Sequence, residues 1–265
     1  MNILEKIIEQ KKIEVADRKL LRSIGDLEKE KYFSKENISL KSFVLHPEKT
    51  GIIAEYKRQS PSKGIINHHS TVEDVTAAYT VNGASGLSVL TDELFFGGTI
   101  SDLIKATANK IPLLRKDFMI DEYQLIEAKA YGADVILLIA ACLTPAEVKK
   151  MATTAKQLGL EVLLEIHNEQ ELDHICNEVD LVGVNNRNLK NFEVKIETSL
   201  QLISQIPESK PAVAESGINQ VETIITLQNA GFKGFLIGEH FMKNEQPAIA
   251  FADFVNQLKS MQDAN

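Results

Sequence analysis

Charged side chains that could exchange protons follow several short apolar runs of this sequence. Glu55 and Lys57 stand at the end of one run, Lys116 follows a second and Glu165 ends a third. If these runs are strands of one sheet, the carboxylates and ammonium groups converge at one edge, where burial and mutual charge shift their pKa values. Such groups are suited to general acid–base catalysis. The pattern therefore predicts a catalytic site rather than unrelated surface charges.

Other runs add groups that could bind a small anion. Asn185 and Arg187 follow one run, Glu215 ends the next, and Gly238 follows the last. Alternation along a strand places Asn185 and Arg187 on one face, as it does for Glu55 and Lys57. Ser216, Gly217 and Gly238 come after the last two runs, where barrel enzymes commonly bind phosphate through backbone N–H groups. We therefore expect a phosphorylated ligand.

The histidines and aromatic residues of these loops carry weaker signals. His68 and His69 have no third ligand at a useful spacing, so no metal site is predicted. His167 follows a run and could line the mouth of the barrel, but it is interpreted as an ordinary loop residue. Phe96 fits either the core or an aromatic wall for a ring-bearing substrate, and both interpretations stay open.

The elements that must position these residues are eight short apolar runs, typical of parallel strands buried on both faces. Most intervals are about 20 to 30 residues, which leaves room for one helix in each crossover. Eight nearly equal units favour a closed barrel over a doubly wound open sheet. The predicted strands cover residues 52–56, 87–90, 111–114, 135–139, 162–166, 181–184, 212–214 and 235–237.

Helical periodicity appears in several of the intervals. Segments 71–82, 121–131 and 219–230 carry apolar residues at helical spacing and stop at or near a glycine. Thr144-Pro145 begins a further helix with a capping residue and a first-turn proline. The fold class predicted is α/β, a (β/α)8 TIM barrel over residues 51–265. Residues 1–45 form a helical N-terminal extension, and residues 1–265 form a single domain.

Composition excludes several classes of protein. The 265 residues are 44% hydrophobic and 25% charged with a net charge of -8, which disfavours disorder and nucleic-acid binding. No apolar stretch approaches the roughly 20 residues that a membrane helix needs, and no signal peptide is evident, so a cytoplasmic protein is expected. Cys142 and Cys176 are interpreted as structural thiols.

With these residues in place, the chain resembles the indole-3-glycerol-phosphate synthase family. The resemblance spans essentially the whole length, including the N-terminal helical segment, and its longest and most specific string is IAEYKRQSPSKG at 53–64. Shorter strings follow in order: LTD at 90–92, FGG at 96–98, LRKDF at 114–118, LE at 164–165, GVNNRNL at 183–189 and AESGI at 214–218.

The resemblance implies the substrate 1-(2-carboxyphenylamino)-1-deoxyribulose 5-phosphate, with no cofactor or metal. The reaction closes the pyrrole ring, releases carbon dioxide and then water, and yields indole-3-glycerol phosphate. Lys116 matches the acid that protonates the ketone, and we expect burial or a neighbouring cation to depress its pKa. Glu165 would stabilise the iminium intermediate, and Glu55 and Lys57 would serve the dehydration.

The resemblance also implies the residues that hold the substrate. Asn185 and Glu215 would bind sugar hydroxyls, Arg187 with Ser60 nearby would face the carboxylate, Phe96 would pack on the ring, and Ser216, Gly217, Gly238, Lys57 and the N–H of Glu239 would surround the phosphate.

Two positions depart from the family pattern, and two other functions stay open. Glu239 would have to turn its carboxylate from the phosphate, and Arg115 stands where an apolar residue is common. One alternative is another phosphosugar barrel enzyme, such as phosphoribosylanthranilate isomerase, but the Cys/Asp pair it requires is not seen at the strand ends. The other is a non-catalytic phosphometabolite-binding barrel, which intact catalytic positions disfavour. Partner enzymes are not predicted.

Overall fold

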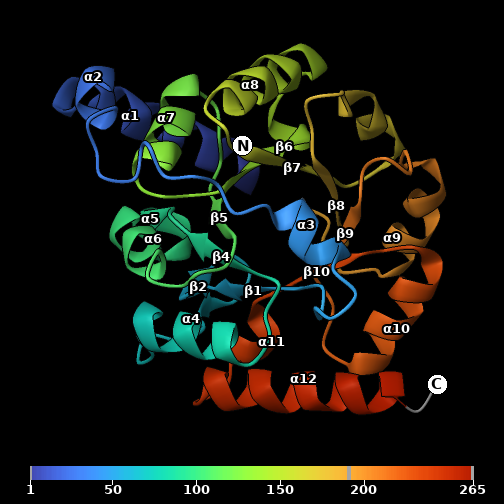
Figure 1. Ribbon diagram of the computed structural model, residues 1–265. Coiled ribbons are helices and arrows are strands. Elements are labelled where there is room, and N and C mark those ends of the chain that lie inside the picture. Colours follow the sequence, from blue (N-terminus) through green and yellow to red (C-terminus); the bar gives the residue numbers. More distant parts are fainter. Residues whose placement is uncertain (1, 190–191, 264–265) are drawn as a thin grey trace.

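Eight parallel strands close into a barrel in a computed structural model that describes residues 2–189 and 192–263 (Figure 1). Strand β1 pairs with both β4 and β10, which closes the sheet. The predicted (β/α)8 barrel is therefore confirmed. The strands are β1 (Ile52–Tyr56), β4 (Gly86–Leu90), β5 (Leu113–Lys116), β6 (Val135–Ile139), β7 (Glu161–Ile166), β8 (Leu181–Asn185), β9 (Ala212–Glu215) and β10 (Gly234–Ile237).

The boundary of β5 differs from the prediction. The strand begins at Leu113 rather than Ile111 and extends to Lys116. Pro112 lies between the two starts, and proline has no N–H to give to a strand ladder. The shift places Lys116 on the strand itself, paired in register with Leu90 of β4.

Helices surround the barrel in most crossovers, as predicted. They are α4 (Val72–Val81), α5 (Glu93–Phe96), α6 (Ile100–Ala106), α7 (Glu122–Ala130), α8 (Pro145–Gln157), α9 (Glu197–Leu202), α10 (Val221–Ala230), α11 (Glu239–Met242) and α12 (Pro247–Asp263). The exception is the crossover from β7 to β8, which has only the 3₁₀ helix η2 (Glu169–His174). A two-stranded hairpin of β2 (Gln59–Ser60) and β3 (Gly64–Ile65) follows β1.

Apolar side chains of the strands and of one N-terminal helix fill the interior of the barrel. Ile53, Leu114 and Leu163 belong to an apolar cluster that also contains Leu40 and Val44 of α3 (Leu40–Leu45). Helix α3 lies in front of the strands in Figure 1, at the end where the strands begin. The N-terminal end of the barrel is thus closed by a segment that precedes the first strand.

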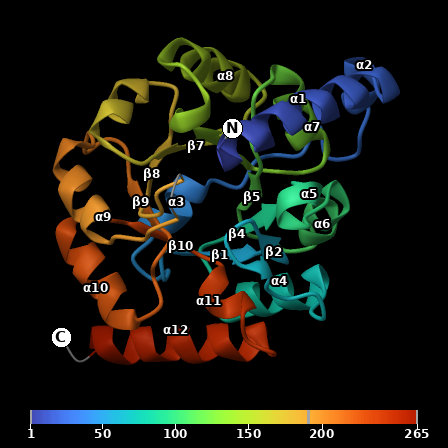
Figure 2. The same cartoon turned by 180° about the vertical axis from the view of Figure 1, so that it is seen from behind.

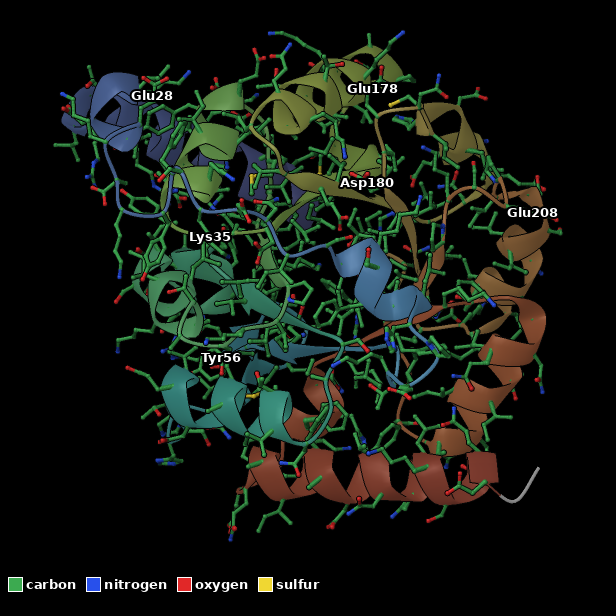
Figure 3. All side chains as sticks on the ribbon, viewed as in Figure 1. Glu28, Lys35, Tyr56, Glu178, Asp180 and Glu208 are labelled. Atoms are coloured by element: carbon green, nitrogen blue, oxygen red, sulfur yellow. The ribbon has the colours of Figure 1, made fainter. Side chains whose placement is uncertain are left out.

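The other end of the N-terminal segment lies at the opposite face of the barrel. Helix α1 (Ile3–Leu21) is followed by the short α2 (Ile24–Leu27). The start of α1 is visible in Figure 2, which shows the molecule from the side opposite to that of Figure 1. The link from α2 to α3 carries Lys35, labelled in Figure 3, whose Nζ lies 2.8 Å from Oδ1 of the buried Asp134. The segment therefore contacts both ends of the barrel.

Candidate active site

A cavity opens at the carboxyl ends of the strands, between the loops and the start of α1. Its volume is about 130 Å³. It is lined by eleven of the predicted site residues: Glu55, Lys57, Ser60, Phe96, Lys116, Glu165, Asn185, Arg187, Glu215, Ser216 and Glu239. Gly217 and Gly238 line an adjoining cavity that shares Lys57, Arg187 and Ser216 with the first.

Lys116 lies at the centre of the charged groups. Its Nζ is 3.3 Å from Glu165 Oε2 and 3.9 Å from Glu215 Oε2. Burial favours the neutral amine, but the carboxylates of Glu165, Glu215 and Glu55 outweigh burial and raise the pKa of Lys116. The expected depression of this pKa is therefore wrong in this site. Lys116 is a protonated ammonium there and has a proton to donate.

Glu55, on β1, and Lys57, directly after β1, form an ion pair. Glu55 Oε1 lies 2.8 Å from Lys57 Nζ, and Ser88 Oγ donates to Glu55 Oε2 at 3.2 Å. Burial acts to raise the pKa of Glu55, but the charges of Lys57 and Lys116 outweigh it and lower that pKa. The predicted shared face is confirmed, and it holds a carboxylate beside an ammonium group.

Glu165 has polar partners on both carboxylate oxygens. Oε2 faces Lys116, while Oε1 accepts a hydrogen bond from Asn185 Nδ2 at 3.1 Å and lies 3.1 Å from His167 Nε2. Burial opposes ionisation, but the charge of Lys116 and the contacts with His167 and Asn185 lower the pKa of Glu165. The carboxylate is therefore ionised. The interpretation of His167 as an ordinary loop residue is wrong, because its side chain is buried against Glu165.

Glu215 differs from these carboxylates. Burial and the negative charge of Glu165 raise its pKa to about 8, against the opposing effect of Lys116. A carboxylic acid that is neutral at pH 7 can donate a hydrogen bond to an oxygen of a ligand. Two neighbouring carboxyl groups with pKa values pushed apart are a common arrangement for acid and base roles.

The loops after β9 and β10 approach the cavity through their backbone. Ser216 and Gly217 both have positive φ, 66° and 79°, a conformation that is unusual for the serine. Gly238 precedes α11, and a Cβ there would lie 2.6 Å from Glu55 Oε1, so only glycine fits without displacing that carboxylate. These features bring backbone groups to the rim where a phosphate was predicted.

The carboxylate of Glu239 points across the mouth and contacts two cations. Its Oε2 lies 3.1 Å from Arg187 Nη2, and its Oε1 lies 3.6 Å from Lys63 Nζ. Arg187 was predicted to face a substrate carboxylate, and in this structure a protein carboxylate holds the same guanidinium. Arg115, the other departure, is fully buried beside Asp117 and Glu127, outside the barrel mouth.

An apolar wall faces these charges. Phe96 is half-buried, and its ring centroid lies 5.9 Å from that of Phe118. Both rings line the cavity together with Leu90 and Ile139. Of the two interpretations left open for Phe96, the aromatic wall is the one that this position fits.

Sequence reasoning missed the contribution of α1 to the site. Ile3, Leu4 and Ile7 line the cavity, and the wholly buried Lys11 holds the helix in place. Lys11 Nζ lies 2.9 Å from Asp92 Oδ2 and 3.0 Å from Asp117 Oδ1. The signal was available, because Lys11 occupies the same helical stripe as the buried Ile7 and Val15.

The remaining candidates stand apart from the site. The ring centroids of His68 and His69 lie 4.0 Å apart, with the rings tilted by 39°. Cys142 and Cys176 are both partly exposed free thiols. Within residues 2–189 and 192–263, no group of three or more His, Cys, Asp or Glu side chains is placed to hold a metal ion.

Comparisons with known proteins agree with this geometry. The family model described as indole-3-glycerol phosphate synthase matches residues 4–254. An indole-3-glycerol phosphate synthase of Bacteroides thetaiotaomicron is 45% identical over 97% of this chain and 99% of its own length, and one of Bordetella pertussis is 40% identical over 96% and 99%.

Solved structures add the fold. The alpha subunit of tryptophan synthase from Legionella pneumophila superposes with a TM-score of 0.58 at 12% identity, covering 81% of this chain and 93% of that one. An identity this low supports the barrel fold and nothing more specific. The full-length matches, by contrast, extend over both the N-terminal segment and every strand end described above, and the chain belongs to the indole-3-glycerol phosphate synthase family.

Proposed function

We propose that the groups around Lys116 convert 1-(2-carboxyphenylamino)-1-deoxyribulose 5-phosphate to indole-3-glycerol phosphate. Membership of the family makes the protein a lyase of tryptophan biosynthesis that acts on a phosphorylated small molecule. The observation that carries the assignment of roles is the position of Lys116. It is a partly buried ammonium group between Glu165 and Glu215, and it lines the cavity.

Ring closure is the step assigned to Lys116. The ring carbon that bears the carboxylate attacks the ketone carbon, and the ketone oxygen takes a proton from Lys116 Nζ to become a hydroxyl group. The aniline nitrogen becomes an iminium cation, which the ionised Glu165 stabilises by charge. Loss of carbon dioxide returns its bonding electrons to the ring and neutralises that cation.

Dehydration is the step assigned to Glu55 and Lys57. The hydroxyl group leaves as water with a proton from an ammonium group, and a carboxylate takes the proton from the neighbouring carbon. The ion pair at 2.8 Å supplies one group of each kind. Asn185 and the neutral Glu215 are placed to hold sugar hydroxyls, since both line the cavity beside Lys116.

Recognition of the two ends of the substrate is assigned to opposite walls. Phe96 packs on the aromatic ring, and Arg187 with Ser60 faces its carboxylate, which requires the guanidinium to exchange Glu239 for the substrate. The phosphate lies among Ser216, Gly217, Gly238, Lys57 and the N–H of Glu239, where the cavity adjoins the loops after β9 and β10.

The proposal extends to the setting in which the enzyme works. We place residues 1–265 in one domain, with 1–45 as its helical extension, and in the cytoplasm, without nucleic acid, membrane or cofactor. Among the helices of the described residues, none is long and apolar enough to cross a membrane.

Lys116→Met separates the proposed catalysis from binding. Methionine keeps most of the side-chain volume but has no proton to donate, so kcat is expected to fall by about 10²–10⁴-fold. Binding of a non-reactive substrate analogue, measured by calorimetry, is expected to stay within about tenfold, because recognition rests on other walls.

The matched control is Lys105→Met, which removes an exposed ammonium group of α6 that pairs with Glu73. It is expected to leave turnover and binding unchanged. Wild-type turnover in Lys116→Met would remove Lys116 from its role. A wild-type protein that binds the analogue but does not turn over the substrate would instead favour the non-catalytic phosphometabolite-binding barrel.

A further inference from the structure

His167 lies beside the site but outside the cavity that Lys116 and Glu165 line. It follows β7 two residues after Glu165, so strand alternation directs both side chains to the same face. The imidazole is 10% exposed and lines a neighbouring cavity with Asn168 and Glu171. The contact of His167 with the catalytic groups of the main cavity is therefore through Glu165.

The imidazole ring is placed between two carboxylates. Nε2 lies 3.1 Å from Glu165 Oε1, an ion-pair contact without the alignment of a linear hydrogen bond. Nδ1 lies 3.1 Å from Glu171 Oε2. A carboxylate only accepts hydrogen bonds, so this arrangement suits an imidazolium with a proton on each nitrogen.

Glu171 is itself held in position. Its Oε2 accepts the backbone N–H of His167 at 2.7 Å, and its Oε1 accepts Asn168 Nδ2 at 2.9 Å. Burial alone lowers the pKa of His167, but the contacts with Glu165 and Glu171 outweigh burial and raise it to about 10. The order Glu171, His167, Glu165 is thus a chain of alternating charge that leads to the site.

The charges around Glu165 explain why such a chain is useful. Lys116 on β5 contacts Glu165 Oε2, and His167 contacts Oε1. When Lys116 gives its proton to the substrate, the buried Glu165 loses one of its two cationic neighbours. Burial then favours a protonated, neutral Glu165, which could no longer stabilise an iminium cation.

We propose that His167 is a positioning residue which, held by Glu171, keeps Glu165 ionised and oriented while Lys116 is without its proton. The inference rests on the roles proposed above for Lys116 and Glu165. Other charged groups that line the cavity beside His167 come from α1 and from the segment that follows β8: Glu5, Glu9, Arg187, Glu193 and Lys195.

His167→Gln tests this role, because glutamine is a polar side chain that can still donate to a carboxylate but carries no charge. We expect kcat to fall about tenfold or more with KM changed less than about threefold, since the binding walls are untouched. The acid limb of the kcat–pH profile is expected to move upward by about one pH unit or more, because loss of a nearby cation raises the pKa of a carboxylate. Glu171→Gln is expected to give a smaller shift in the same direction.

His174→Gln is the matched control. His174 is a buried histidine at the end of η2, the 3₁₀ helix that also carries Glu171. Its ring nitrogens lie 2.9 and 3.1 Å from the backbone carbonyl oxygens of Leu143 and Glu171. A purely structural role for histidines in this segment predicts equal effects in the two variants. A His167→Gln profile that matches wild type, or matches His174→Gln, overturns the proposal.

A measurement on the wild-type protein does not depend on the variant folding or on turnover. In ¹⁵N-labelled enzyme, both imidazole nitrogens of His167 are expected to remain protonated at pH 8. A neutral imidazole at pH 7 overturns the inference whatever the variants do. Failure of the wild-type enzyme to turn over the substrate, with His167 charged, counts against the proposed function instead.

Discussion

Glu215 is the carboxyl group of the site that is most sensitive to pH near neutrality. Its folded-state pKa of about 8 lies above the ordinary value of 4.5. Between these values the folded protein holds a proton that the unfolded chain releases, so the free energy of unfolding falls as pH rises through that window. Below about pH 4.5 both states are protonated and this loss is absent.

Glu215→Gln removes the contribution of this residue to the pH dependence of the free energy of unfolding, because glutamine resembles the protonated acid but does not titrate. The stability of the variant relative to wild type is expected to increase from pH 4.5 to pH 8, by at least about 1 kcal/mol. Urea unfolding at a series of pH values measures the difference. A difference that is constant across the window contradicts a raised pKa for Glu215.

Which residues form the site could be predicted from the sequence, but not their protonation. Glu55, Lys116 and Glu165 were found because the end of a barrel strand fixes where a side chain lies. The pKa of Lys116 was predicted in the wrong direction, because it depends on carboxylates from three other strands. His167 was missed for the same reason, since its partner Glu171 is identified only by the path of the chain after β7.

At the scale of elements, α1 is attached to the barrel by buried charge. Lys11 contacts Asp92, which follows β4, and Asp117, which follows β5, and all three side chains are almost wholly buried. Removal of the Lys11 ammonium group would leave the buried carboxylates of Asp92 and Asp117 without its compensating charge. This wholly buried ammonium group therefore adds to the more exposed ion pairs of Arg18 with Glu127 and of Lys19 with Asp121 in holding the helix over the cavity.

Lys11→Met is expected to lower the free energy of unfolding by about 3–5 kcal/mol. It is also expected to raise KM, because Ile3, Leu4 and Ile7 of the same helix line the cavity. Lys12→Met is the control, since the neighbouring Lys12 is 59% exposed and pairs with Glu9 on the surface. Equal stability and equal KM for the two variants would show that Lys11 does not hold the helix.

Helical periodicity predicted the helix α1 but not the surface against which it packs. The stripe of Ile7 and Val15 indicates a buried face and leaves open which surface covers it. A buried lysine in that stripe needs an anionic partner, and its partners Asp92 and Asp117 lie 81 and 106 residues further along the chain. Contacts at such separations follow from the closed barrel and not from local pattern.

At the scale of the whole molecule, repetition of similar units made the barrel predictable. Eight apolar runs at similar intervals match the eight strands that close, and the crossover from β7 to β8 is the one where the predicted helix is replaced by η2. The N-terminal segment could be recognised as an extension. That it plugs one end with α3 and borders the cavity at the other with α1 required the structure.

The fold alone does not identify the chemistry. The alpha subunit of tryptophan synthase, which is 12% identical to this chain, has a similar fold and a different name. The central claim is that Lys116 and its carboxylates turn over one particular phosphorylated anthranilate derivative. The most direct test gives purified protein 1-(2-carboxyphenylamino)-1-deoxyribulose 5-phosphate and follows the fluorescence of the indole product. We expect steady product formation that is lost in both Lys116→Met and Glu165→Gln. A wild-type protein that binds the compound without forming product, or variants that form it at the wild-type rate, would contradict the account.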